Sequence, residues 1–364
     1  MKVVFAGGGT GGHIYPALAI AKELRKKRPD IELLFIGGRK GIESKIVKEA
    51  GYAFKTIPAI GLPRKLSPVI VSFIWKLAVS VFLSRRILRS FMPAAVIATG
   101  GYVSGPPIIA ARSLGLPVVI QEQNSYPGLT NRMLGRYADI LFLGFNDASR
   151  YFGTNTETMV TGNPIRGSIV SGERSESSRA FGLDPAVKTV LVFGGSQGAA
   201  AINRAISATV QSIAERNIQV LWQTGEKAYK EWRYFDGSYG GKIRMVPYID
   251  NMEQAYAAAD LVIARAGAMS IAEITACGLP AVFIPLPSAT GNHQEHNARS
   301  LVEAGAADMI LERDLSSATL EKRILEILLS EERLIAMSKA SEGLGKSDAA
   351  KTIAEIILDR YGKT

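Results

Sequence analysis

The sequence predicts an α/β protein built from two Rossmann-like domains. The chain has 364 residues, which is too long for one ordinary hydrophobic core. Short apolar runs alternate with helical patterns, as in parallel sheets that are covered by helices. A strand, a glycine loop and a helical pattern follow one another at the N-terminus and again in the middle of the chain, beginning at Lys2 and at Thr189.

The first glycine loop runs from Gly7 to His13 and contains five glycines in its first six residues. A helical pattern follows it, from Ile14 to Leu24. Such a loop exposes backbone N–H groups at a helix N-terminus, where partial positive charge favours a bound anion. An ordinary strand-to-helix turn needs far fewer glycines, so the loop predicts a ligand site with His13 as a titratable group beside it.

The remaining apolar runs complete two series of strands. Gly162–Arg166 is typical of a linker between them, so we expect domains at residues 1–163 and 164–345 and a C-terminal helix at 346–364 whose packing the pattern does not assign. The expected strands after the first are Ile31–Ile36, Ala95–Ala98, Val118–Gln121, Ile140–Leu143, Thr189–Phe193, Val220–Trp222, Ile243–Val246, Leu261–Ala264 and Ala281–Ile284.

The net charge of +10 is concentrated in the first half. Residues 1–163 carry 21 Lys and Arg against 9 Asp and Glu, whereas the rest carry 22 against 24. The basic half therefore faces phosphate substrates, anionic lipid or nucleic acid. The single cysteine, Cys277, excludes a disulfide framework and suits a reducing cytoplasm, and we interpret it as a small core residue. The N-terminus runs directly into a strand, so no signal peptide is expected.

One helical stretch, Val69–Leu83, is apolar at 12 of 15 positions. Its length of about 22 Å falls short of the ~30 Å hydrocarbon core, so it does not span a membrane. Basic residues surround it, and no acidic residue occurs from Gly61 to Met92. Two interpretations of Val69–Met92 stay open: a face that attaches peripherally to anionic lipid, or a buried helix with basic ends.

Common nucleotide and metal motifs fit poorly. Gly7, Gly9 and Gly12 match the spacing of the dinucleotide fingerprint, but the second strand ends at Gly37-Gly38 without the acidic residue that would bind a ribose. No P-loop motif occurs. A metal site would rest on His293, Glu295 and His296, which supply too few ligands, so none is expected.

The second half carries a more specific pattern at the ends of two successive strands. Leu261–Ala264 leads into Arg265-Ala266-Gly267 and a helix with Glu273, and the next strand leads to Gln294. Carboxylate and amide side chains there suit sugar hydroxyls, because open α/β sheets bind ligands at the carboxyl ends of their strands.

These motifs together resemble the peptidoglycan N-acetylglucosaminyltransferases that convert lipid I to lipid II, which are two-domain (GT-B) glycosyltransferases with an interdomain cleft. The resemblance covers essentially the whole chain in the family's order. It is carried by Gly8–His13, Thr99–Tyr102, Gln121–Asn124, Gly162–Arg166, Gly194–Gly198, Tyr248–Met252, Arg265–Ala268 with Glu273, and His293-Gln294 with Asn297-Ala298.

The resemblance implies an inverting transfer of N-acetylglucosamine from UDP-GlcNAc to the 4-hydroxyl of undecaprenyl-pyrophosphoryl-MurNAc-pentapeptide. It implies that the second domain binds the donor and that the first binds the acceptor at the cytoplasmic face of the membrane, as a peripheral protein. No metal or other cofactor is expected, since UDP-GlcNAc is a substrate. The implied substrate-binding residues are Thr10, Gly11, Gly12, Asn124, Arg166, Ser196, Ile249, Arg265, Glu273 and Gln294.

Inversion needs a general base for the acceptor hydroxyl. His13 is the preferred candidate, because an unperturbed histidine titrates near pH ~6.5. Its alternative role is that of an orienting hydrogen-bond donor, and Glu122 is the second candidate base. Two other functions stay open: a UDP-N-acetylglucosamine 2-epimerase, which needs no lipid acceptor, and a basic module that binds nucleic acid. Against the second, the glycine loops are poor in aromatic residues and no nucleic-acid motif is recognisable, so no nucleic-acid partner is expected.

Overall fold

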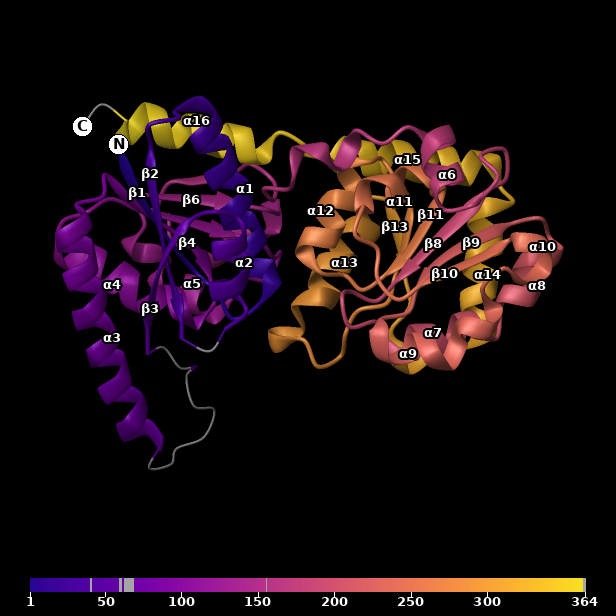
Figure 1. The fold of residues 1–364 in the computed structure, drawn as a ribbon, viewed down its shortest axis with the longest axis horizontal. Helices are drawn as coiled ribbons and strands as arrows, with labels where there is room; N and C mark the ends of the chain where they lie inside the picture. Colours follow the sequence, from indigo (N-terminus) through magenta and orange to yellow (C-terminus); the bar gives the residue numbers. More distant parts are fainter. Residues whose placement is uncertain (40, 59–60, 62–68, 155, 363–364) are drawn as a thin grey trace. The chain divides into compact units, whose positions relative to one another are not determined.

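The chain forms two compact units (Figure 1). The computed structural model describes all residues except 40, 59–60, 62–68, 155 and 363–364. Unit 1 comprises Met1–Arg166 together with Asp348–Thr364, and unit 2 comprises Gly167–Ser347. Each unit is built on one parallel sheet, and the prediction of two Rossmann-like α/β domains is confirmed.

Unit 1 contains a seven-stranded sheet. Its strands are β1 (Lys2–Gly7), β2 (Glu32–Gly38), β3 (Ala53–Ile57), β4 (Ala95–Gly100), β5 (Val118–Glu122), β6 (Ile140–Leu143) and β7 (Thr158–Val160). They pair in parallel in the order β3-β2-β1-β4-β5-β6-β7. The strand order reverses between β1 and β4, and ligands of open α/β sheets bind at such a point.

Helices cover both faces of this sheet because successive side chains of a buried strand point to opposite sides. Val3 and Phe5 pack with residues of α1, whereas Val4 packs with Leu88 of α3 on the other face. The helices of unit 1 are α1 (Gly11–Lys27), α2 (Glu43–Glu49), α3 (Val69–Phe91), α4 (Gly105–Ser113), α5 (Leu129–Leu134) and α16 (Ala349–Tyr361).

The C-terminal helix α16 belongs to unit 1, where it lies beside α1 (Figure 1). Ile353 and Ile357 are fully buried in the core that α1 shares with the sheet. Each such side chain contributes about 1.5–3 kcal/mol when it is removed from water. Lys27 also forms an ion pair with Glu355 at 2.7 Å. The chain thus returns to its first domain after completing the second.

Unit 2 contains a six-stranded sheet. Its strands are β8 (Thr189–Phe193), β9 (Gln219–Gln223), β10 (Ile243–Val246), β11 (Leu261–Ala264), β12 (Ala281–Phe283) and β13 (Ala307–Met309). They pair in parallel in the order β10-β9-β8-β11-β12-β13, which is the Rossmann order. Here the order reverses between β8 and β11.

The helices of unit 2 surround this sheet. A buried cluster joins Val190 and Trp222 of the sheet to Ile206 of α7 and Leu320 of α14. These helices are α6 (Arg174–Ala180), α7 (Ala200–Ser207), α8 (Val210–Glu215), α9 (Glu226–Trp232), α10 (Ser238–Gly241), α11 (Met252–Ala258), α12 (Ala268–Ala276), α13 (His293–Glu303), α14 (Ser317–Leu328) and α15 (Glu331–Leu344).

Candidate functional site

The first glycine loop of unit 1 leads from β1 into the N-terminus of α1, at the point where the strand order reverses. Thr10 precedes the helix in an extended conformation, and the first turn contains no acidic residue. Thr10 and Gly12 are exposed and Gly11 is partly exposed. The backbone N–H groups of this helix start therefore suit an anion, and the structure brings the three predicted loop residues together there.

A buried carboxylate, that of Glu43, lies beneath this loop. Only 1% of Glu43 is exposed, and its oxygens accept hydrogen bonds from the Gly38 N–H at 2.9 Å and from the Gly9 N–H at 3.3 Å. Glu43 thereby ties the loop after β1 to the loop after β2. Sequence reasoning missed this residue.

His13 is held by residues from the ends of two other strands. Its Nδ1 lies 3.1 Å from the Thr99 carbonyl oxygen and 3.1 Å from the Gln123 Oε1. Gln123 donates its Nε2 to that same carbonyl at 2.7 Å, which fixes Oε1 as an acceptor. Since both neighbours of Nδ1 accept, Nδ1 carries the proton, and Nε2 is the ring atom of the neutral imidazole that can accept one.

Two glycines, the last residue of β4 and the one after it, leave room for the imidazole. Gly100 and Gly101 have φ values of +99° and +77°, which favour glycine. A Cβ at Gly100 would lie 2.9 Å from the His13 Nδ1, and one at Gly101 would lie 2.2 Å from the Gly8 carbonyl oxygen. The Thr99–Tyr102 motif therefore packs against the His13 ring and accepts its hydrogen bond.

The carboxylate of Glu122, the second candidate base, is 1% exposed and saturated with hydrogen bonds. Oε1 accepts from the Asn124 backbone N–H at 2.8 Å and from the Asn124 Nδ2 at 3.1 Å. Oε2 accepts from the Gly128 N–H at 3.0 Å and from the Asn131 Nδ2 at 2.8 Å. This geometry favours a positioning role, in which Glu122 holds Asn124 at the end of β5.

In unit 2 the second glycine loop follows β8, where the strand order of that sheet reverses. Ser196 in this loop is exposed, whereas Ile249 after β10 is buried. The side chain of Gln223, at the end of β9, connects the two segments. Its Nε2 donates to the Gly195 carbonyl at 3.0 Å, and its Oε1 accepts from the Ile249 N–H at 3.1 Å. The backbone N–H of Ile249 is thus already paired inside the protein.

Glu273 lies in α12, on the other side of the reversal point, and is oriented by a tyrosine that sequence reasoning missed. The Tyr256 hydroxyl donates to the Glu273 Oε2 at 3.1 Å. Tyr256 is 1% exposed, and its ring packs edge-on against Phe193 of β8. The glycine loop and the predicted sugar-binding carboxylate therefore follow neighbouring strands and are joined through one aromatic pair.

Arg265 is held by backbone and by a carboxylate. Its Nη1 donates to the carbonyl oxygens of Ile284 and Pro285 at 3.0 and 3.1 Å, and its Nη2 pairs with Glu312 at 2.5 Å. Gln294 accepts the Leu286 N–H at 3.0 Å through Oε1. Both side chains thus shape the segment after β12.

Two other predicted residues stand apart from these contacts. Arg166 is exposed and is counted with unit 1, not with the second domain to which the sequence interpretation assigned it. His293 donates from Nδ1 to the Thr290 carbonyl oxygen at 2.8 Å, and Glu295 pairs with Arg299 at 2.8 Å. Within the part of the chain that the structure describes, no three His, Cys, Asp or Glu side chains are placed to hold a metal ion.

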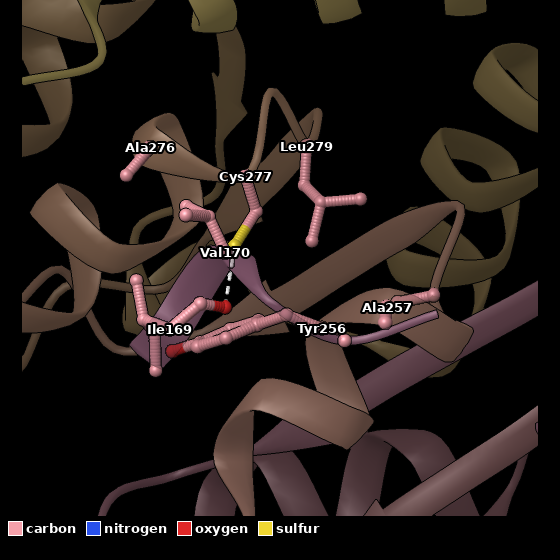
Figure 2. Close-up of a pocket in the computed structure, with 9 residues that line it drawn as sticks. Ile169, Val170, Tyr256, Ala257, Ala276, Cys277 and Leu279 are labelled. Atoms are coloured by element: carbon pink, nitrogen blue, oxygen red, sulfur yellow. Dashed lines mark hydrogen bonds between the residues drawn. The ribbon is translucent and has the colours of Figure 1, made fainter. Parts of the chain in front are cut away.

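Cys277 lines a cavity of about 330 Å³ in unit 2 (Figure 2). Its Sγ donates to the Ile169 carbonyl oxygen at 3.5 Å. Burial, followed by the nearby Glu273 carboxylate, raises the pKa of this thiol to about 12. A protonated thiol is a poor nucleophile, so the structure agrees with the interpretation of Cys277 as a packing residue.

Helix α3 buries two of its serines and exposes several of its large apolar residues. Ser80 and Ser84 are fully buried, whereas Ile74, Trp75 and Phe82 are 59%, 70% and 66% exposed. We call these three side chains the apolar face of α3. Three exposed basic residues of the same helix, which we call the α3 cations, are Lys76, Arg86 and Arg89. Of the helices within the described ranges, none is long and apolar enough to cross a membrane.

The interpretation of Val69–Met92 as a buried helix with basic ends holds for only part of the described side chains. Leu88 packs into the core, but the apolar face of α3 meets solvent. Arg85 is partly buried and donates to the Ser113 carbonyl at 3.2 Å, so it belongs to the contact between α3 and α4 and not to the cationic surface.

Two sheets of this topology with a glycine loop at each reversal point are the architecture found in two-domain glycosyltransferases. Family models of this class match both halves of the chain. The glycosyltransferase family 28 N-terminal domain matches residues 3–143, and the glycosyltransferase family 28 C-terminal domain matches residues 189–353. The chain belongs to glycosyltransferase family 28.

The chain is similar over nearly its whole length to curated members of that family. It is 45% identical to the UDP-N-acetylglucosamine--N-acetylmuramyl-(pentapeptide) pyrophosphoryl-undecaprenol N-acetylglucosamine transferase of Halothermothrix orenii, with 99% of each chain covered. It is 41% identical to the enzyme of that name from Desulforudis audaxviator, over 100% of this chain and 99% of the relative. These identities place the chain, within family 28, among the transferases of that name.

Solved structures agree with this assignment. The crystal structure of Acinetobacter baumannii MurG matches with a TM-score of 0.79 at 28% identity, covering 98% of this chain and 99% of that one. A UDP-N-acetylglucosamine 2-epimerase matches with a TM-score of 0.68 at 16% identity, over 100% and 97%. The likeness to the epimerase shows a shared fold alone, whereas the transferases share sequence throughout.

Proposed function

We propose that this protein transfers N-acetylglucosamine from UDP-GlcNAc to the 4-hydroxyl of undecaprenyl-pyrophosphoryl-MurNAc-pentapeptide, forming lipid II. The observation that carries the proposal is the full-length identity of 41–45% with transferases named for this reaction. The donor bond is α and the new bond is β, so one in-line displacement inverts the sugar carbon. UDP leaves with the electron pair of the broken bond, and the acceptor hydroxyl loses its proton to a base.

The donor binds to unit 2 at the carboxyl ends of its strands. Ser196 and its loop contact the diphosphate, and the Glu273 carboxylate accepts from the ribose hydroxyls. Gln294 contacts the sugar, and Arg166 supports the nucleotide. The hydrogen bond from Tyr256 supports the ribose role, because it fixes one Glu273 oxygen.

The uracil is recognised by the backbone around Ile249. Since the Ile249 N–H donates to Gln223, the contact uses a carbonyl of this segment, which accepts the N3–H of uracil. Arg265 is a positioning residue. Its hydrogen bonds to the Ile284 and Pro285 carbonyl oxygens hold the segment after β12 to which Gln294 is also hydrogen-bonded.

Unit 1 supplies the general base and the acceptor site. His13 takes the proton of the 4-hydroxyl at Nε2, since Nδ1 is committed to two acceptors. The helix start at Thr10-Gly11-Gly12 binds the pyrophosphate of the acceptor, and the Glu122-held Asn124 contacts the sugar that reacts.

The protein binds peripherally to the cytoplasmic face of the membrane through the apolar face of α3 and the α3 cations. Each of the three exposed apolar side chains gains about 1.5–3 kcal/mol on leaving water, and each cation near an anionic surface gains about 1 kcal/mol. The outer face of α3 exposes a tryptophan and two other large apolar side chains, which supports a lipid partner for that face.

One assay tests the proposed reaction. UDP release from UDP-GlcNAc is measured with and without the lipid-linked acceptor, and the product is examined for a β-linked disaccharide. We expect release that depends on the acceptor. Conversion of UDP-GlcNAc without acceptor, with epimerised sugar as product, would overturn the proposal in favour of an epimerase.

A further inference from the structure

Gln223 occupies a place in unit 2 from which one side chain reaches two parts of the proposed donor site. Its strand β9 lies between β8 and β10 in the sheet. The glycine loop follows β8, and the Ile249 segment follows β10. Because all three strands are parallel, their carboxyl ends meet at the same edge, and the last side chain of the middle strand can touch both loops.

The amide of Gln223 uses both of its ends for these contacts. It is 3% exposed, with Nε2 bound to the Gly195 carbonyl and Oε1 bound to the Ile249 N–H. Its O and N positions are fixed by this pairing, since a carbonyl can only accept and a backbone N–H can only donate. We call these two hydrogen bonds the Gln223 bridge; it requires a carboxamide on a side chain of the length of glutamine.

The bridge sets the direction of the Gly195–Ser196 peptide. The Gly195 carbonyl accepts from Gln223 and also from the Gly198 N–H at 2.8 Å, so it points into the protein. In a trans peptide the C=O and the following N–H point in opposite directions. The N–H of Ser196 consequently points away from the protein, on the exposed side of the loop.

The same reasoning applies to the peptide that joins Tyr248 and Ile249. Its N–H points toward Gln223, so the Tyr248 carbonyl points the opposite way. We propose that Gln223 is a positioning residue for the nucleotide: it aims a backbone donor at the diphosphate and fixes the backbone segment that reads uracil. This inference rests on the proposed function, because it takes the two loops as the diphosphate and uracil sites.

Calorimetric binding of UDP and CDP to the full chain tests the proposal. Gln223→Met keeps the side-chain volume but removes both hydrogen bonds. We expect UDP to bind about tenfold to a hundredfold more weakly, and the preference for UDP over CDP to fall, because the freed backbone no longer distinguishes the two bases. Gln223→Glu keeps an acceptor for Ile249 but not the donor to Gly195, so UDP should bind more weakly with the preference retained.

Gln219 provides a matched control at the other end of the same strand. It is 4% exposed and also bridges two segments, through Asp184 and Thr189. Gln219→Met should lower stability comparably and leave UDP affinity and base preference unchanged. Equal effects of the two methionine variants on both nucleotides would show that Gln223 only fills the sheet. If Gln223→Met does not fold, an unchanged UDP affinity in Gln223→Glu overturns the proposal. A wild-type protein without preference for UDP would instead refute the donor site itself.

Discussion

Replacing His13 by alanine should abolish most of the turnover while leaving donor binding nearly intact. A positioned general base contributes about 10²–10⁴-fold to rate, which corresponds to about 3–5.5 kcal/mol of barrier. The variant removes the proton acceptor Nε2 and one hydrogen bond at Nδ1. The donor contacts proposed for unit 2 are untouched, so KM for UDP-GlcNAc should change less than about threefold.

The structure indicates that this variant will fold. The Thr99 carbonyl and the Gln123 Oε1 both lose the His13 donor, but the Thr99 carbonyl keeps its hydrogen bond from Gln123. The expected loss is about 1 kcal/mol of unfolding free energy, because the site is partly exposed and water can replace the ring.

The assay is steady-state formation of the β-linked product from UDP-GlcNAc and lipid acceptor, across a range of pH. Wild-type kcat/KM should fall at acidic pH as His13 becomes protonated, and His13→Ala should lack that limb. Gln123→Met should cost less than His13→Ala, since Thr99 still accepts from Nδ1. A loss confined to KM for UDP-GlcNAc, with kcat unchanged, would remove His13 from the chemistry.

Three further perturbations test other parts of the structure. Charge reversal of the α3 cations should weaken binding to anionic vesicles at least tenfold in a sedimentation assay, because each lost cation removes about 1 kcal/mol. The control is charge reversal of three exposed cations of unit 2, Lys227, Lys230 and Arg233. If the α3 variant binds the vesicles as well as this control, the α3 surface is excluded as the membrane contact. Cys277 should resist iodoacetamide at pH 8 in the folded protein, because a pKa of about 12 leaves on the order of one thiol in 10⁴ ionised. Since folding raises the pKa of this thiol, its contribution to the free energy of unfolding should decline as pH rises from 9 toward 12, and Cys277→Ala should lack that decline. Rapid alkylation of the folded protein would contradict both expectations. Gly101→Ala should lower thermal stability by several degrees and reduce kcat, because a Cβ would meet the Gly8 carbonyl at 2.2 Å. Gly115→Ala has the same kind of backbone strain, with φ of +69°, but open space around the Cβ, so it should lower stability less and leave kcat unchanged.

The central strands were predictable because their burial leaves a plain signal. Thr189–Phe193 and Leu261–Ala264 are mostly apolar runs at the centre of the second sheet, and the structure has strands with those bounds. The short outer strands β3, β7 and β13 were missed. They lie at or next to sheet edges, where polar residues such as Lys55 and Thr158 are tolerated, so no apolar run marks them. The contact of α16 with α1 was also missed, since periodicity gives a helix its buried face but not its partner.

Sequence patterns located both glycine loops, His13 and Glu273, because special backbone geometry and strand ends leave local signatures. They did not reveal what orients these residues. Glu43 and Tyr256 lie far along the chain from the groups they fix, and an isolated Glu or Tyr in a helical stretch has no distinctive pattern. The inward turn of Ser80 and Ser84 was equally hidden, since a polar stripe on an apolar helix is usually assigned to solvent.

In both units a buried glutamine supports the loops at the reversal point of the sheet. At the reversal point of each sheet the proposed ligand site exposes backbone groups, while the buried polar groups in the layer beneath it need hydrogen-bond partners. A carboxamide does this well, because it donates and accepts at once and carries no charge to desolvate. Gln123 joins Thr99 to His13 in unit 1, and Gln223 joins Gly195 to Ile249 in unit 2. A buried glutamine at a strand end is therefore the signal that would have found this supporting layer from sequence, in each half of the chain.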